Sequence, residues 1–94
     1  MDDARLKKIR FRAWHRGFRE ADLILGPFAD ANLERLSLDQ LDEFERLIDQ
    51  PDQDLYGWIT GAIATPEAFE GEMLDLIRGF RFFAHAAFGA DHGG

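Results

Sequence analysis

The sequence predicts an all-α fold, a compact single-domain five-helix bundle. Apolar residues recur at intervals of three and four along almost the whole chain, which is the spacing of one face of an α-helix. Alternation with a period of two is absent and valine does not occur, although β-branched residues are typical of strands. Ninety-four residues can bury one adequate core but not two, so we expect one domain over residues 1–88 and a disordered tail over residues 89–94.

Two helices are expected in the first third of the chain. The first spans residues 3–16, and Gly17 marks its end or a junction, because glycine is common just after a helix. Its apolar face carries Leu6, Ile9 and Ala13. The second spans residues 18–33, with a kink or a stop near Gly26, because Pro27 removes a helical hydrogen bond and crowds the preceding turn.

The third helix has the clearest signals. It covers residues 37–50, where Ser37 and Gln40 stand at the two positions of a capping box. Its buried stripe is formed by Leu41, Phe44, Leu47 and Ile48. The acidic residues on its other side are expected to form a solvated face. They are Asp39, Asp42, Glu43, Glu45 and Asp49.

Two more helices follow. The fourth is short and starts at Asp52 or Asp54, either of which can cap it, and Gly61 weakens its last turn. The fifth starts with Thr65 as the cap and Pro66 at the first helical position, where proline is favoured. It is expected to be a long closing helix.

Charge is unevenly distributed along the chain. Residues 1–20 hold seven Lys or Arg against three Asp or Glu, and residues 21–94 hold four against fifteen, so net charges of +4 and −11 make up the overall −7. A body this negative repels phosphate backbones, and we expect no binding of nucleic acid through it. No apolar run approaches the roughly 20 residues that span a bilayer, which predicts a soluble intracellular protein without membrane insertion.

Residues that could carry catalysis are few. The chain has no cysteine, and its one serine is explained as a helix cap. Its histidines, His15, His85 and His92, include no pair one helical turn apart, as a zinc-binding helix would require. We therefore predict neither an enzyme nor a metal site.

The stretch from Arg16 to Asp22 is the strongest candidate for a functional site, because a glycine lies between charges of both signs. One interpretation is a helix-breaking glycine with incidental surface charges. However, Arg16 precedes Glu20 by four residues, the poorer order for a helical ion pair, and even the better order contributes only about 0.2 to 0.5 kcal/mol. The other interpretation is a protein-docking patch, in which Gly17 lets a partner's backbone approach and the charged side chains bind it. The predicted partner-binding residues are Arg16, Gly17, Phe18, Arg19, Glu20 and Asp22.

The same stretch carries a family signature, Arg-Gly-x-x-Glu followed by a second acid two residues on. Its positions are occupied by Arg16, Gly17, Glu20 and Asp22. Over roughly residues 5 to 80 the chain resembles the succinate dehydrogenase FAD assembly factors, small helical proteins of bacteria and mitochondria. The similarity extends through Pro27 and Phe28 and through the Asp-Leu-x-x-Trp run that begins at Asp54.

The resemblance implies a compact five-helix protein that binds the flavoprotein subunit of succinate dehydrogenase, or of the related fumarate reductase. It implies that the protein promotes covalent attachment of FAD to a histidine of that subunit. In the family the signature's Arg, Gly and Glu are linked to this binding, which here carries over to Arg16, Gly17 and Glu20. The resemblance also implies no catalytic centre of the chain's own, so that FAD is not stably bound. The absence of a visible mitochondrial presequence favours a bacterial cytoplasmic protein, which we expect to be a monomer.

A second function class stays open at this point. A regulatory module could use its basic first helix to bind an acidic protein or a nucleic-acid backbone. The cations that would do so are Lys7, Lys8, Arg10 and Arg12. Such binding would depend strongly on salt and little on Gly17.

Overall fold

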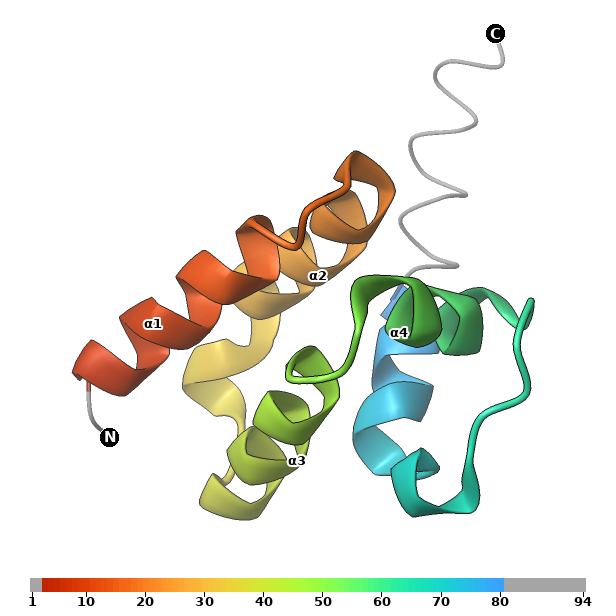
Figure 1. Cartoon of the computed structure of the whole chain (residues 1–94). Helices are drawn as coiled ribbons and strands as arrows, with labels where there is room; N and C mark the ends of the chain where they lie inside the picture. Colours follow the sequence, from red (N-terminus) through yellow and green to blue (C-terminus); the bar gives the residue numbers. More distant parts are fainter. Residues whose placement is uncertain (1–2, 81–94) are drawn as a thin grey trace, which may run out of the picture.

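The computed structural model describes residues 3–80, and all regular structure in this part of the chain is helical. In chain order the elements are α1 (Asp3–Trp14), α2 (Arg19–Asn32), the short 3₁₀ helix η1 (Leu33–Arg35), α3 (Leu38–Ile48), α4 (Asp52–Thr60), the 3₁₀ helix η2 (Glu67–Phe69) and a helix over residues 72–80. Figure 1 shows α1 and α2 lying along one another. The predicted all-α fold of five helices is confirmed. The predicted tail over residues 89–94 lies outside the described residues.

One hydrophobic core joins the five helices. The apolar faces predicted for the first and third helices are buried in it, and the ring centroids of Phe28 in α2 and Phe44 in α3 lie 5.5 Å apart. The helix over residues 72–80 closes the core with Met73, Leu74 and Ile77. Among the helices of residues 3–80, none is both long and apolar enough to cross a bilayer.

The start of α3 is the capping box that the sequence predicts. The Gln40 amide donates to the Ser37 hydroxyl at 3.1 Å, and the Ser37 amide donates to the Gln40 side chain at 2.9 Å. Two amides at the helix start are thereby satisfied. Residues three apart in sequence contain this whole interaction, so no tertiary information is needed to predict it.

The second helix differs from the prediction, because a stop near Gly26 is wrong. α2 continues through Pro27 to Asn32. The residues after the proline, Phe28 and Ala29, are fully buried, and this burial outweighs the one hydrogen bond that proline removes. Gly26 is also buried, with the Trp14 ring packed over it.

The fourth helix has a different start and a different role for its last glycine. Pro51 occupies the N-cap position of α4, with no side-chain cap, so neither Asp52 nor Asp54 caps it. Asp52 is instead its first residue, and its carboxylate is bound by Arg16. Gly61 ends the helix in the left-handed conformation, with φ +85°, as glycine commonly does at a helix C-terminus.

The fifth α-helix begins later than predicted. Pro66 precedes only the three-residue η2, and the α-helix starts at residue 72. Thr65 does not cap it; its hydroxyl accepts a hydrogen bond from Arg78 at 2.7 Å. The cap comes from a distant element, because Glu43 of α3 accepts a hydrogen bond from the Met73 amide at 2.9 Å. Short-range signals could not reveal this cap.

Candidate protein-docking site

The predicted docking block forms the connection between α1 and α2 and the first turn of α2. Residues 15–18 link the helices, and Arg19 opens α2. The block lies beside the start of α4, and the two segments line a shallow surface hollow. The hollow is lined by Gly17, Phe18, Pro51, Asp52, Gln53 and Asp54. The structure thus joins the signature to a segment more than thirty residues later, which the sequence did not indicate.

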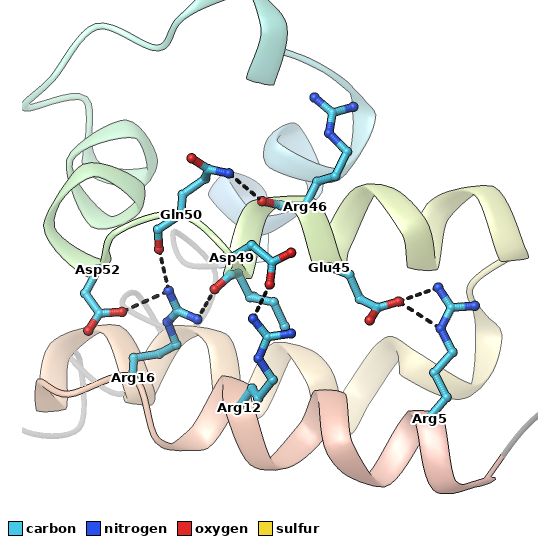
Figure 2. A network of polar contacts seen from close by, with 9 residues as sticks. Arg5, Arg12, Arg16, Glu45, Arg46, Asp49, Gln50 and Asp52 are labelled. Atoms are coloured by element: carbon cyan, nitrogen blue, oxygen red, sulfur yellow. Dashed lines mark hydrogen bonds and ion pairs between the residues drawn. The ribbon is translucent and has the colours of Figure 1, made fainter.

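The Arg16 side chain points into the molecule (Figure 2). It is only 7% exposed. Its Nη1 donates to the Ile48 carbonyl, and its Nη2 donates to the Gln50 carbonyl at 2.8 Å and lies 2.8 Å from Oδ1 of Asp52. Arg16 therefore ties the α1 to α2 connection to the end of α3 and the start of α4.

These contacts complete the C-terminus of α3. The last four carbonyls of a helix have no partner within it, and here all four are satisfied. Those of Glu45 and Leu47 accept backbone amides, and that of Arg46 accepts the Gln50 side chain at 3.1 Å. The Ile48 carbonyl accepts Arg16, whose positive charge also suits the negative end of the helix dipole. Among the described residues the buried Arg16 Nε has no partner.

Two more members of the block have internal contacts. The Asp22 carboxylate accepts a hydrogen bond from the Arg16 backbone amide at 2.6 Å. The Phe18 ring is half-buried and packs edge-on against Tyr56 of α4, with centroids 5.0 Å apart. Both contacts help to hold the connection in one conformation.

Gly17 satisfies two local requirements of the chain. Its φ is +107°, in a region that residues with a β-carbon rarely adopt. A β-carbon at this position would lie 2.8 Å from Oδ2 of Asp52. The sequence suggested that this glycine makes room for a partner's backbone, whereas the structure supplies a reason within the molecule itself.

Not all residues of the docking block face outward. Gly17, Arg19 and Glu20 are exposed, and neither the Arg19 nor the Glu20 side chain forms a hydrogen bond or ion pair with residues 3–80. Arg16 and Glu20 do not pair across a continuous helix, because the helix is broken between them. A cation and an anion without partners in residues 3–80 therefore follow directly after Gly17 and Phe18, which line the hollow.

A ladder of ion pairs links α1 to α3 (Figure 2). Arg5 binds Asp42 and Glu45, and Arg12 binds Asp49. The hydrogen bonds that Arg5 donates to Asp42 and Glu45 raise the pKa of Arg5 above its ordinary value. The acidic side of α3 is thus only partly the solvated face that was predicted.

A sequence signal for this ladder exists. Arg5 and Arg12 are seven residues apart, and the acids that they bind have helical spacing as well. Matching the two sets requires knowing that α1 packs beside α3.

The residues 3–80 contain no group of three His, Asp or Glu placed to hold a metal ion.

The chain is similar to proteins that are named as assembly factors. A family model described as "Flavinator of succinate dehydrogenase" matches residues 7–81. The chain is 40% identical over 72 residues to the mitochondrial succinate dehydrogenase assembly factor 2 of Dictyostelium discoideum, covering 77% of this chain and 51% of that protein. It is 35% identical over 71 residues to the FAD assembly factor SdhE of Acetobacter pasteurianus, covering 76% of this chain and 65% of that protein. The chain thus spans between half and two thirds of the length of these relatives.

Proposed function

The chain belongs to the family described as flavinators of succinate dehydrogenase, and from this premise we propose that it is an assembly factor without catalysis of its own. It binds the flavoprotein subunit of succinate dehydrogenase and promotes covalent attachment of FAD to that subunit. The names of its relatives support this function. So do the exposed charges of Arg19 and Glu20 near Gly17, which have no ion-pair partner among residues 3–80.

The reaction takes place on the partner. The docking block, Arg16 to Asp22, binds the flavoprotein in the conformation in which its own histidine reacts with bound FAD. A protein that binds one conformation more tightly than another shifts the equilibrium toward it. The chain therefore needs no stably bound FAD.

The finer parts of the proposal concern the choice of partner, the oligomeric state and the cellular compartment. The related flavoprotein subunit of fumarate reductase is a second partner, and the chain acts as a monomer in the bacterial cytoplasm. Pull-down from a native lysate, with identification of the bound flavoprotein, tests the choice of partner. Light scattering of the free protein tests the monomer.

The central test is the covalent flavin of the partner. In cells that lack this protein, in-gel flavin fluorescence of the dehydrogenase subunit is expected to fall, and the wild-type gene is expected to restore it. Undiminished fluorescence would contradict the proposed function.

A matched pair of variants tests the docking block. The double variant Arg19→Ala, Glu20→Ala should restore fluorescence poorly, because it removes the two free charges of the block. The control is Glu34→Ala, Arg35→Ala, which removes another exposed pair of opposite charges in η1, just beyond the other end of α2. Equal rescue by the two would place docking elsewhere on the molecule.

A further inference from the structure

We infer that Arg16 promotes partner binding from inside the molecule, as a positioning residue whose guanidinium does not touch the partner. This inference rests on the proposed function and deepens it. It divides the signature into an inward arginine, which fixes the connection between α1 and α2, and an outward surface that includes Gly17, Arg19 and Glu20. The signature arginine is then needed for the shape of the docking surface.

The first argument is the engagement of the guanidinium. Both terminal nitrogens of Arg16 are bound, to two backbone carbonyls and one carboxylate, and the side chain is 7% exposed. To reach a partner, the guanidinium would have to leave all three acceptors. The Ile48 and Gln50 carbonyls would then lose their charge-assisted hydrogen bonds. Arg19, three residues later, is exposed, and its side chain forms no hydrogen bond or ion pair within residues 3–80.

The second argument is that the connection is held from several sides around Arg16. Its backbone amide is bound by Asp22, and its side chain is bound by residues 48, 50 and 52. The carboxylate of Asp52 binds Arg16 through one oxygen, while the other lies 2.8 Å from the position of a Gly17 β-carbon. Phe18 then packs on Tyr56 of α4. The two walls of the hollow are therefore fixed to each other.

A surface that is fixed before binding loses little conformational entropy when a partner arrives. Without the Arg16 side chain, the connection at Gly17 and Phe18 loses its bonds to the Ile48 and Gln50 carbonyls and to Asp52, and binding must order it. The affinity then falls even though no partner contact has been removed. A direct contact and a positioning role thus predict different behaviour for Asp52.

The experiment is a double-mutant cycle on partner affinity. The variants are Arg16→Ala, Asp52→Ala and the double variant, and the dissociation constant for the purified flavoprotein subunit is measured for each. Each single change is expected to weaken binding roughly 10- to 100-fold. The double variant should be no weaker than the worse single variant, because Asp52→Ala removes one of the contacts that Arg16→Ala already removes. Additive losses, or wild-type affinity of Asp52→Ala beside a loss in Arg16→Ala, would overturn the inference.

The control is Arg12→Ala, which removes a neighbouring pair between α1 and the end of α3 without touching the connection. It should bind the partner as the wild type does. If it weakens binding as much as Arg16→Ala, the effect is general loosening of α1 and the inference is wrong. The wild-type affinity is measured first, and if the wild type does not bind the flavoprotein, the proposed function fails by itself.

Amide hydrogen exchange of the free variants gives a second readout that involves no partner. Arg16→Ala and Asp52→Ala should both raise exchange in residues 16–20 and 51–55. Arg12→Ala should leave these segments as they are in the wild type. Unchanged exchange in Arg16→Ala, with affinity lost, would show that the guanidinium contacts the partner directly.

Discussion

Gly17 and Gly61 are the two residues with positive φ in residues 3–80, at +107° and +85°. Their surroundings differ. A β-carbon on Gly17 would meet the Asp52 carboxylate at 2.8 Å, whereas a β-carbon on Gly61 would meet no described residue within 4 Å. Gly61 is thus required only for its positive φ. Gly17 is required both for its positive φ and because a β-carbon has no room there.

This difference predicts unequal costs of alanine at the two glycines. Gly61→Ala should lower the free energy of unfolding by about 1 to 2 kcal/mol, the cost of a β-carbon in the left-handed region. Gly17→Ala should cost about 1 kcal/mol more, because the Asp52 carboxylate is held by Arg16 and must also move. Urea unfolding followed by circular dichroism measures both. Equal costs would show that the Asp52 carboxylate moves aside without a measurable loss of stability.

Among the elements, α2 shows most clearly how packing overrides local preference. Gly26 and Pro27 both disfavour a helix interior, yet α2 continues through them. A β-carbon on Gly26 would lie 2.3 Å from the Trp14 ring, and the Trp14 indole donates to Asp30 at 3.2 Å. The glycine is what lets α1 approach α2.

Alanine at Gly26 should therefore destabilise the protein. In an open helix, Gly→Ala gains about 1 kcal/mol, but overpacking against a large side chain costs about 1 to 3 kcal/mol. The net expected loss is about 0 to 2 kcal/mol, toward the upper end because the position of the new β-carbon lies 2.3 Å from the rigid Trp14 ring. Gly79→Ala is the control, because Gly79 is helical and no atom of residues 3–80 lies within 4 Å of its β-carbon position. It should be neutral or stabilising by the same urea assay, and a stabilising Gly26→Ala would contradict this account.

The helices also show which features of the fold can be predicted from the sequence. The capping box of α3 and its apolar stripe depend on residues within two turns, and they were predicted correctly. The stop in α2 and the start of the fifth helix were wrong, because burial of Phe28 and Ala29 in the core and the Glu43 carboxylate of α3 act there through tertiary contacts. For the docking block, the sequence singled out Arg16 to Asp22, and the part of these residues in partner binding stays a prediction. The sequence could not show that Arg16 turns inward, because its acceptors lie 32 to 36 positions later.

For the whole molecule, the uneven charge of the chain becomes partly internal. The basic first helix faces the acidic remainder, with Arg10 bound to Asp30 and Arg12 bound to Asp49. These pairs are partly exposed, so each contributes only about 0 to 1 kcal/mol. Their larger effect is on what the surface presents, because cations already beside carboxylates attract a phosphate backbone weakly. Of the four cations that could bind a nucleic-acid backbone, Arg10 and Arg12 are therefore already paired with carboxylates.

We accordingly expect no appreciable nucleic-acid binding. Fluorescence anisotropy of a labelled duplex, titrated with the protein at several salt concentrations, measures it. If Lys7 and Lys8 alone contacted phosphates, the slope of log K against log salt would be about −1.8, whereas four cations would give about −3.6. We expect no binding near physiological salt, and at low salt at most the shallower slope, abolished by Lys7→Glu, Lys8→Glu. The steeper slope would mean that Arg10 and Arg12 leave their carboxylates for phosphate, and the basic first helix would then be a binding arm.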